Sequence, residues 1–78
     1  MVIRHRALTA FGSNVRRRRQ RRTLTQEQLA ASADLDPTYI SGIERGVRNP
    51  SILSVLRIAQ ALGTTVSALS SGIDSPSR

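Results

Sequence analysis

The residues with the clearest chemistry are arginines, which fill six of the seven positions from Arg16 to Arg22. Guanidinium groups bind phosphates and carboxylates through paired N–H groups. Because seven residues cover the whole circumference of a helix, these side chains cannot all face one partner. The five acids of the chain cannot pair with all of them either. The run favours an external anion, and double-stranded DNA supplies about one charge per 1.7 Å. A merely solvated basic face is the alternative.

The positive charge is concentrated at one end of the chain. All 12 basic residues of the 78-residue sequence are arginine, and the formal net charge is +7. Eight arginines fall in residues 1–22, which contain no acid, whereas the remaining 56 residues carry four arginines and five acids. Such an excess of positive charge indicates a nucleic acid as the binding partner, or less strongly an anionic membrane surface.

Residues that carry catalysis or metal binding are scarce. The chain has no cysteine and one histidine, His5, in an end expected to be flexible. It also lacks a carboxylate pair and a Gly-rich phosphate loop, so we expect no enzyme, metal, cofactor or small-molecule ligand. No apolar run approaches the roughly 20 residues of a membrane span, and we expect no signal peptide. The expectation is a single small domain in the bacterial or phage cytoplasm, without a membrane partner.

Apolar residues at helical spacing, divided by Gly and Pro, predict five short helices and no strand. The first spans about 7–22, and its inner side carries Leu8, Phe11 and Val15. Thr25 and Gln28 form a capping box that opens the second helix. This helix ends near Ala33, and Asp34 is expected to adopt a left-handed conformation.

The remaining three helices have similar signals at their ends. Asp36 followed by Pro37 begins the third helix, and Gly46 ends it. The fourth helix lies within 51–63, and Thr65 caps a short fifth helix. The predicted inner faces are Ile52, Val55, Leu56, Ala59 and Leu62 in the fourth helix, and Val66 and Leu69 in the fifth.

Two short helices joined by the three-residue turn 34–36 suggest a helix-turn-helix. From Phe11 to Leu69 the chain resembles the phage repressor and Cro-like (XRE) family of helix-turn-helix proteins. The matching stretches are LTQEQLA at 24–30, TYISGIERG at 38–46, RNPSI at 48–52 and LRIAQALG at 56–63. Within that family, the stretch LDPTYISGIERGVRN looks most like the controller proteins of restriction–modification systems.

The resemblance implies an all-α fold, namely a compact five-helix lambda-repressor-like DNA-binding domain. The domain would cover 7–69, between flexible ends at 1–6 and 70–78. Residues 26–33 would form the supporting helix and 37–45 the recognition helix. The resemblance also implies a homodimer on a pseudo-palindromic double-stranded DNA operator, with half-sites about 34 Å apart or a multiple of that distance.

Four positions depart from the family pattern. Gly is frequent in the family where this chain has Thr23, and Leu where it has Arg18. The turn position often held by Gly is Asp34 here. The controller proteins tend to have Arg in place of Pro37, so their operator sequence is not expected to transfer to this chain.

Arg19 and Glu44 are expected to form a structural ion pair. Arg19 borders the apolar stripe of the first helix. Glu44 shares a helical face with Ile40 and Ile43, where an unpaired carboxylate would be costly. In the resembling family the matching Arg and Glu pair with each other.

The outer face of the recognition helix is expected to read DNA bases. With Ile40 inward, the residues that point most nearly outward are Thr38, Gly42 and Arg45, flanked by Tyr39 and Ser41. We expect Thr38, Ser41 and Arg45 to contact base edges. Gly42 costs about 1 kcal/mol in mid-helix relative to Ala, and it is expected to let the helix lie deep in the major groove.

Contacts to the DNA backbone are expected around this helix. Gln26 lies at the N-terminus of the supporting helix, where free N–H groups and a partial positive charge suit a phosphate. A phosphate contact and simple packing are equally compatible with Tyr39. The expected backbone residues are Arg16, Arg17, Gln26, Asp36, Tyr39, Arg48 and Asn49. DNA shape is expected to add to specificity.

A dimer interface is expected near the C-terminus. Leu53 lies about 130° from the centre of the predicted inner face of its helix, so it should be exposed. Leu53, Leu69 and Ile73 are expected to form an apolar patch, and the resembling family commonly dimerises through its C-terminal helices. A scattered surface leucine is the alternative.

These expectations combine into a dimeric transcriptional regulator that represses by covering a promoter element or activates from an adjacent site. The alternative is an antitoxin of a toxin–antitoxin pair that regulates its own operon. A basic protein without sequence preference is a third possibility, but only Tyr39 offers an aromatic ring for stacking on single strands.

Overall fold

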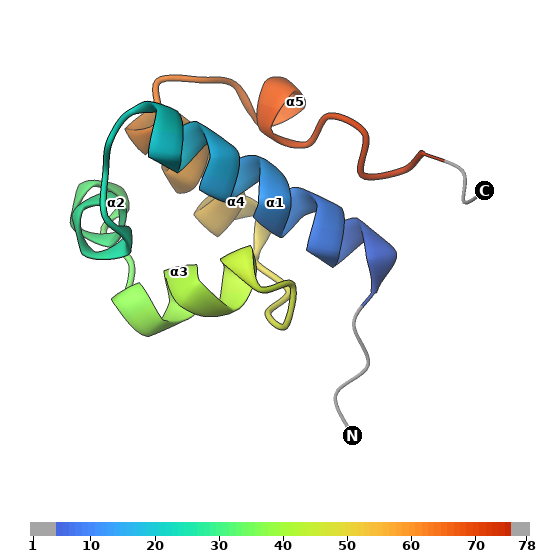
Figure 1. Ribbon diagram of the computed structural model, residues 1–78, viewed down its shortest axis with the longest axis horizontal. Helices are drawn as coiled ribbons and strands as arrows, with labels where there is room; N and C mark the ends of the chain where they lie inside the picture. Colours follow the sequence, from blue (N-terminus) through green and yellow to red (C-terminus); the bar gives the residue numbers. More distant parts are fainter. Residues whose placement is uncertain (1–4, 76–78) are drawn as a thin grey trace.

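The computed structural model describes residues 5–75, and its elements are all helices (Figure 1). They are α1 (Arg6–Arg21), α2 (Gln26–Ala33), α3 (Pro37–Glu44), α4 (Ile52–Ala61) and α5 (Val66–Leu69). Helix α1 packs against α3 on one side and α5 on the other, and α2 packs against α3 and α4. The predicted all-α, five-helix architecture is confirmed.

The helix ends follow the local chemistry that predicted them. The Thr25 hydroxyl accepts from the Gln28 N–H at 3.0 Å, and the Gln28 side chain accepts from the Thr25 N–H at 2.8 Å. The Asp36 carboxylate accepts from the Thr38 N–H at 2.7 Å, which caps α3. Asp34 adopts the expected left-handed conformation with φ of 56°. These caps fix the short turn between α2 and α3.

The core lies at the point where all five helices meet. Its fully buried large side chains are Val15, Leu29, Ile40, Ile43, Ile58 and Leu69. The other members of the core are Phe11, Ala30, Ala33, Val55, Ala59 and Leu62, and partly buried residues such as Leu24, Leu35 and Val66 pack around it. Burial of these side chains is the main force that holds such short helices together, since isolated helices of this length are marginal in water.

The predicted inner face of α4 is partly wrong. Ile52 and Leu56 are 73% and 41% exposed, whereas Ile58, which the prediction omitted, is fully buried. Helix α4 is apolar on most of its circumference, so spacing alone does not select the stripe that faces α2 and α5. Ser54 is also buried on this stripe, where its hydroxyl accepts from the Ser51 hydroxyl at 3.0 Å.

Both predicted flexible ends include residues that the structure describes. Helix α1 begins at Arg6, and the His5 ring nitrogen Nδ1 accepts from the Ala7 N–H at 3.1 Å as its cap. At the other end, the Asn14 side chain donates to the Leu69 and Ser71 carbonyls, and Ile73 packs against the core. The rest of the two predicted flexible ends, 1–4 and 76–78, lies outside the described residues.

Gly12 sets the distance between α1 and α3. A Cβ atom at this position would overlap the backbone carbonyls of Ile43 and Glu44. The absence of a side chain therefore lets α1 lie directly on the C-terminal turn of α3. Within residues 5–75, no helix has the length and apolarity needed to cross a membrane.

Candidate DNA-binding interface

Helix α3 presents one side to the core and the other to solvent. Ile40 and Ile43 are buried against α1 and α2, as predicted. Thr38 and Arg45 are exposed, and Ser41 is half-buried between them. A short polar face is thus held on a helix whose opposite side is fixed in the core, an arrangement suited to insertion into a groove.

Gly42 does not lie open on this face. It is buried, and a Cβ atom there would overlap Cγ of Arg48. The Arg48 side chain therefore crosses α3 at Gly42, and its Cζ atom lies 6.0 Å from the centroid of the Tyr39 ring. Gly42 was expected to point outward, but an arginine from the following loop covers it. Gly42 instead creates room for Arg48 on the exposed side of α3.

The predicted ion pair between Arg19 and Glu44 is present. Nε of Arg19 donates to Glu44 Oε2 at 2.6 Å and Nη2 donates to Oε1 at 2.9 Å. The two side chains are 11% and 3% exposed, and Arg19 Nη1 also donates to the Leu24 carbonyl at 2.7 Å. The hydrogen bond to Glu44 raises the pKa of Arg19, although burial opposes the shift. The pair joins α1 to the C-terminal end of α3.

Gln26 and Asp36 have partners within the fold. Gln26 Nε2 donates to Glu44 Oε1 at 3.1 Å, so the first residue of α2 is tied to the ion pair. The second hydrogen of Gln26 Nε2 and the N-terminal N–H groups of α2 stay compatible with a phosphate. Asp36 is the N-cap of α3, and its carboxylate would repel a phosphate. The structure shows Asp36 as the cap of α3, and its expected contact with the DNA backbone stays a prediction.

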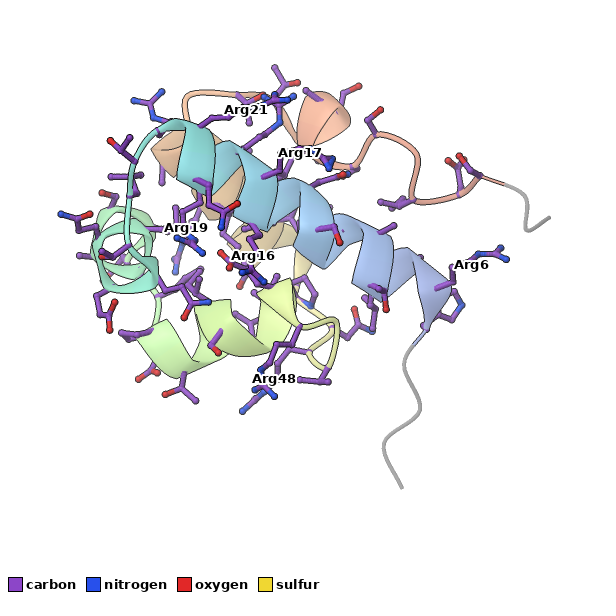
Figure 2. The ribbon with its side chains drawn as sticks, in the orientation of Figure 1. Arg6, Arg16, Arg17, Arg19, Arg21 and Arg48 are labelled. Carbon is purple, nitrogen blue, oxygen red and sulfur yellow. The ribbon has the colours of Figure 1, made fainter. Side chains whose placement is uncertain are left out.

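The arginines of α1 point to different sides (Figure 2). Arg16 and Arg19 lie on the side of α3, together with Arg48 from the loop that follows α3. Arg17 and Arg21 lie on the side of α5. Arg17 Nη2 donates to Asn14 Oδ1 at 2.7 Å, and Asn14 in turn holds the Leu69 carbonyl. The structure thus brings Arg16 together with α3 but does not bring Arg17 there.

The helix-turn-helix family HTH_3 matches residues 15–69. The chain belongs to this helix-turn-helix family. The control protein C.MunI of Mycoplasma sp is 45% identical over 65 residues, which cover 82% of this chain and 88% of that protein. The crystal structure of the restriction–modification controller protein C.AhdI from Aeromonas hydrophila superimposes with a TM-score of 0.78 at 40% identity, covering 80% of this chain and 94% of that one.

A further solved structure contains DNA. It is the restriction–modification controller protein C.Esp1396I, as a tetramer in complex with its natural 35 base-pair operator. It matches this chain with a TM-score of 0.72 at 39% identity over 76% of this chain. Helices α2 and α3 coincide with the ranges expected for the supporting and recognition helices, 26–33 and 37–45, except that α3 ends one residue earlier.

The apolar surface of this helix-turn-helix domain lies on α4. Ile52, Leu53 and Leu56 are the exposed large hydrophobic residues of the described chain, and Leu53 is 62% exposed, as predicted. The predicted patch is otherwise wrong. Leu69 is completely buried because α5 turns it into the core, and Ile73 packs beside Phe11. Ile52 and Leu56 were missed because they had been assigned to the inner face.

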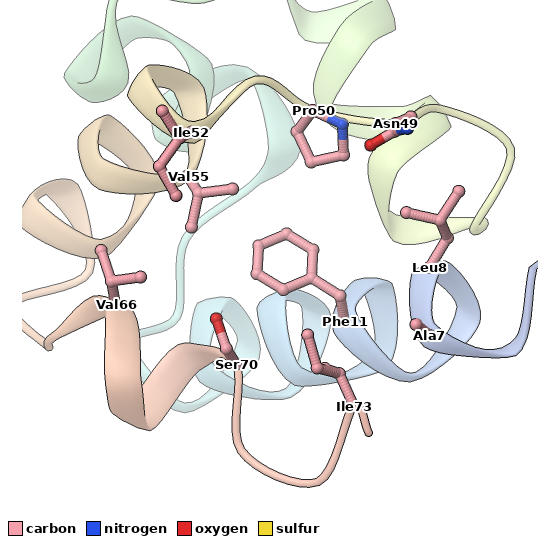
Figure 3. A pocket seen from close by; sticks show the side chains of 10 residues that line it. All are labelled: Ala7, Leu8, Phe11, Asn49, Pro50, Ile52, Val55, Val66, Ser70 and Ile73. Carbon is pink, nitrogen blue, oxygen red and sulfur yellow. The ribbon is translucent and has the colours of Figure 1, made fainter. Parts of the chain in front are cut away.

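A pocket of about 190 Å³ adjoins this surface (Figure 3). The Phe11 ring lies at its centre, with Ile52 and Val55 of α4 on one side and Ile73 of the C-terminal segment on another. Asn49 and Pro50 form part of its rim, so the loop that carries Arg48 continues into the pocket wall. Ile52 belongs both to the pocket and to the exposed apolar surface.

Proposed function

We propose that this protein is a sequence-specific DNA-binding transcriptional regulator that acts as a homodimer on an operator, of the controller type of restriction–modification systems. Two relatives, C.MunI and C.AhdI, are control or controller proteins by name, and the alignment spans most of each. C.Esp1396I, also a controller protein, is known in complex with its operator. The observation that carries the proposal is the polar face of α3, held rigidly by the core and by the Arg19–Glu44 pair.

Direct reading of bases belongs to Thr38, Ser41 and Arg45. The methyl group of Thr38 fits a thymine methyl group, the Ser41 hydroxyl fits either a donor or an acceptor, and Arg45 fits the two acceptors of guanine. Thr38 and Arg45 lie at opposite ends of the exposed face of α3. The Arg48 side chain fills the gap between them, over Gly42.

Backbone contacts belong to residues that surround α3. Arg16 supplies an exposed cation from α1, and Arg48 and Asn49 supply exposed donors from the loop. Tyr39 is half-buried and lies beneath the Arg48 guanidinium, so its ring supports Arg48 while its hydroxyl is available to a phosphate. Gln26 lies at the N-terminus of α2, whose free N–H groups are also available to a phosphate. These contacts position the protein and account for the salt dependence of its binding.

Dimerisation belongs to α4. Ile52, Leu53 and Leu56 would be removed from water by the same surface of a second copy, because a two-fold interface is self-complementary. A dimer places two recognition helices on two half-sites about 34 Å apart. The proposal includes a cytoplasmic location beside the DNA and no catalytic role.

The proposal is tested by selection from a library of random duplexes at about 150 mM salt, where non-specific binding is weak. Selected duplexes are expected to share an inverted repeat. Arg45→Ala should relax selection at one position of each half-site, whereas a backbone variant such as Arg48→Ala should weaken all sequences alike. Recovery of duplexes without a shared sequence would contradict the proposal. An adjacent methyltransferase and endonuclease gene supports the controller type, and an adjacent toxin gene supports the antitoxin alternative.

A further inference from the structure

The two sides of α1 differ in free positive charge. Gly12, Arg16 and Arg19 are four and seven residues apart, so they share the side that packs on α3. Glu44 neutralises Arg19 on that side. Arg16 is then the exposed arginine that α1 offers next to the recognition helix.

The other side of α1 carries more arginines. Arg17, Arg18 and Arg21 follow Asn14 by three, four and seven residues, so all share one side of the helix. Asn14 Nδ2 donates to the Leu69 carbonyl at 2.9 Å and to the Ser71 carbonyl at 2.8 Å, which shows that this side faces α5. Figure 2 shows Arg17 and Arg21 directed away from α3. We call Arg17, Arg18 and Arg21 the outer basic face.

Arg17 is held in place on the outer basic face. Its Nη2 donates to Asn14 Oδ1 at 2.7 Å. The Asn14 amide has a fixed orientation because only its NH₂ group can donate to the two carbonyls. Most of the five guanidinium N–H groups of Arg17 remain available for an anion.

The fold does not balance these charges. Within residues 5–75, the salt bridge of the structure is that between Arg19 and Glu44, which involves none of the outer basic face. Arg17 and Arg21 are neighbours at i and i+4, so their charges repel each other in α1. An external anion removes this repulsion, and the operator beneath α3 is on the wrong side to supply it.

We propose that the outer basic face binds the phosphate backbone of a second DNA duplex while α3 holds the operator. The inference rests on the proposed function, which places the operator on the side of α3. The exposed large hydrophobic residues of the described chain all lie on α4, so the outer basic face lacks an apolar anchor. Protein partners usually need such an anchor, whereas DNA interfaces are polar and strongly positive.

The shape of the molecule allows both duplexes to bind together. Its extents are 34 × 28 × 22 Å, and the outer basic face lies on the side of α1 that is turned away from α3. A dimer carries two copies of the outer basic face. The protein would then bridge two DNA segments, one bound by sequence and the other by charge.

The experiment captures a second duplex on a preformed operator complex. Operator duplex is immobilised, saturated with protein and washed, and a labelled duplex of unrelated sequence is then added at about 50 mM salt. Retention is expected in the wild type, with weak affinity that disappears near 200 mM salt, since it depends on counterion release. Unlabelled duplex and poly-glutamate are added separately as competitors.

Adjacent arginines give a matched pair of variants. Arg16→Gln is expected to weaken operator binding and to reduce its salt slope by about 0.9 for each phosphate that the side chain no longer neutralises, while the second duplex is retained. Arg17→Gln is expected to leave operator affinity and slope unchanged and to reduce retention of the second duplex by about fivefold or more. Arg21→Gln should act like Arg17→Gln, and it leaves the hydrogen bonds of Asn14 in place.

Three results would overturn the inference. The first is a wild-type operator complex that retains no second duplex. The second is an Arg17→Gln or Arg21→Gln variant whose operator affinity, and the salt dependence of that affinity, fall as they do in Arg16→Gln. The third is displacement of the labelled duplex by poly-glutamate more readily than by unlabelled duplex, which would assign the face to an acidic protein. A wild type that does not distinguish operator from unrelated DNA would instead contradict the proposed function itself.

Discussion

Glu44 is the residue on which the interface depends most. Its two carboxylate oxygens accept from Arg19 of α1 and Gln26 of α2, while its backbone ends α3. One buried side chain thus connects the supporting helix, the recognition helix and α1. The pair was predicted because a carboxylate on an apolar face requires a cation and because the matching residues pair in the resembling family. The part played by Gln26 was not predicted, because a neutral amide at a helix start does not require a charged partner.

Glu44→Ala is expected to lower the free energy of unfolding by about 3–5 kcal/mol, because it leaves the Arg19 guanidinium buried without its counter-charge. The hydrogen bond to Glu44 is what raises the pKa of Arg19, so the variant loses that shift, but arginine stays charged at neutral pH in any case and the cost is not relieved. Urea denaturation measures the change. Asp74→Ala, at an exposed acid outside the ion pair, is the control and should stay within about 0.5 kcal/mol of wild type. A destabilisation below about 1 kcal/mol for Glu44→Ala would refute a buried pair.

The backbone conformation of Thr23 leads to a second prediction about stability. It has a φ of 56°, a conformation that a β-branched residue rarely adopts. Thr23→Gly is therefore expected to stabilise the fold by about 0.5–1 kcal/mol, as relief of strain exceeds the added chain entropy. Thr23→Val keeps the branched Cβ and should give no gain. Equal stability of the Gly and Val variants in thermal denaturation would argue against strain at this turn.

At the scale of elements, the packing of α1 on α3 determines where the recognition helix lies. The caps and the left-handed Asp34 were predicted because they depend on neighbouring residues. The close approach at Gly12 was not predicted, because the carbonyls that require it belong to α3, 31 residues or more further along the chain. The orientation of α4 was missed for a related reason, since its neighbours and not its own pattern select the buried stripe.

Gly12→Ala is expected to destabilise the protein by about 2–3 kcal/mol, because the new Cβ atom would push α1 away from the backbone of α3. The sign of this change in stability is informative, because helix propensity alone favours Ala over Gly by about 1 kcal/mol. Ser13→Ala, at the exposed neighbour, should be neutral or slightly stabilising. Circular dichroism during thermal unfolding measures both. Higher stability of the Gly12→Ala variant would contradict the close contact.

At the scale of the whole molecule, charge and apolar surface occupy different faces. The recognition face lies on α3, the exposed apolar residues lie on α4, and the outer basic face lies on the α5 side of α1. The sequence predicted DNA binding from its net charge, but that charge is divided between faces in a way composition cannot reveal. The burial of Leu69 could not be predicted from the sequence either, because it depends on the tertiary fold.

Leu53→Asp is expected to dissociate the dimer, because the two-fold interface would then bury two carboxylates without counter-charges. Sedimentation at micromolar concentration should give a monomer, with far-UV circular dichroism unchanged since Leu53 is 62% exposed within one copy. Gln60→Asp, on an exposed position of the same helix but outside the patch, should remain dimeric. A dimeric Leu53→Asp variant would place the interface elsewhere.

The most direct test of sequence-specific recognition is the affinity of the protein for its selected duplex and for a shuffled duplex of the same composition, measured by fluorescence anisotropy at about 150 mM salt. We predict at least about a thousandfold preference for the selected duplex, bound by two copies of the chain. Equal affinity for both duplexes would show that the arginines bind DNA without reading it, and it would contradict the assignment of α3 as a recognition helix.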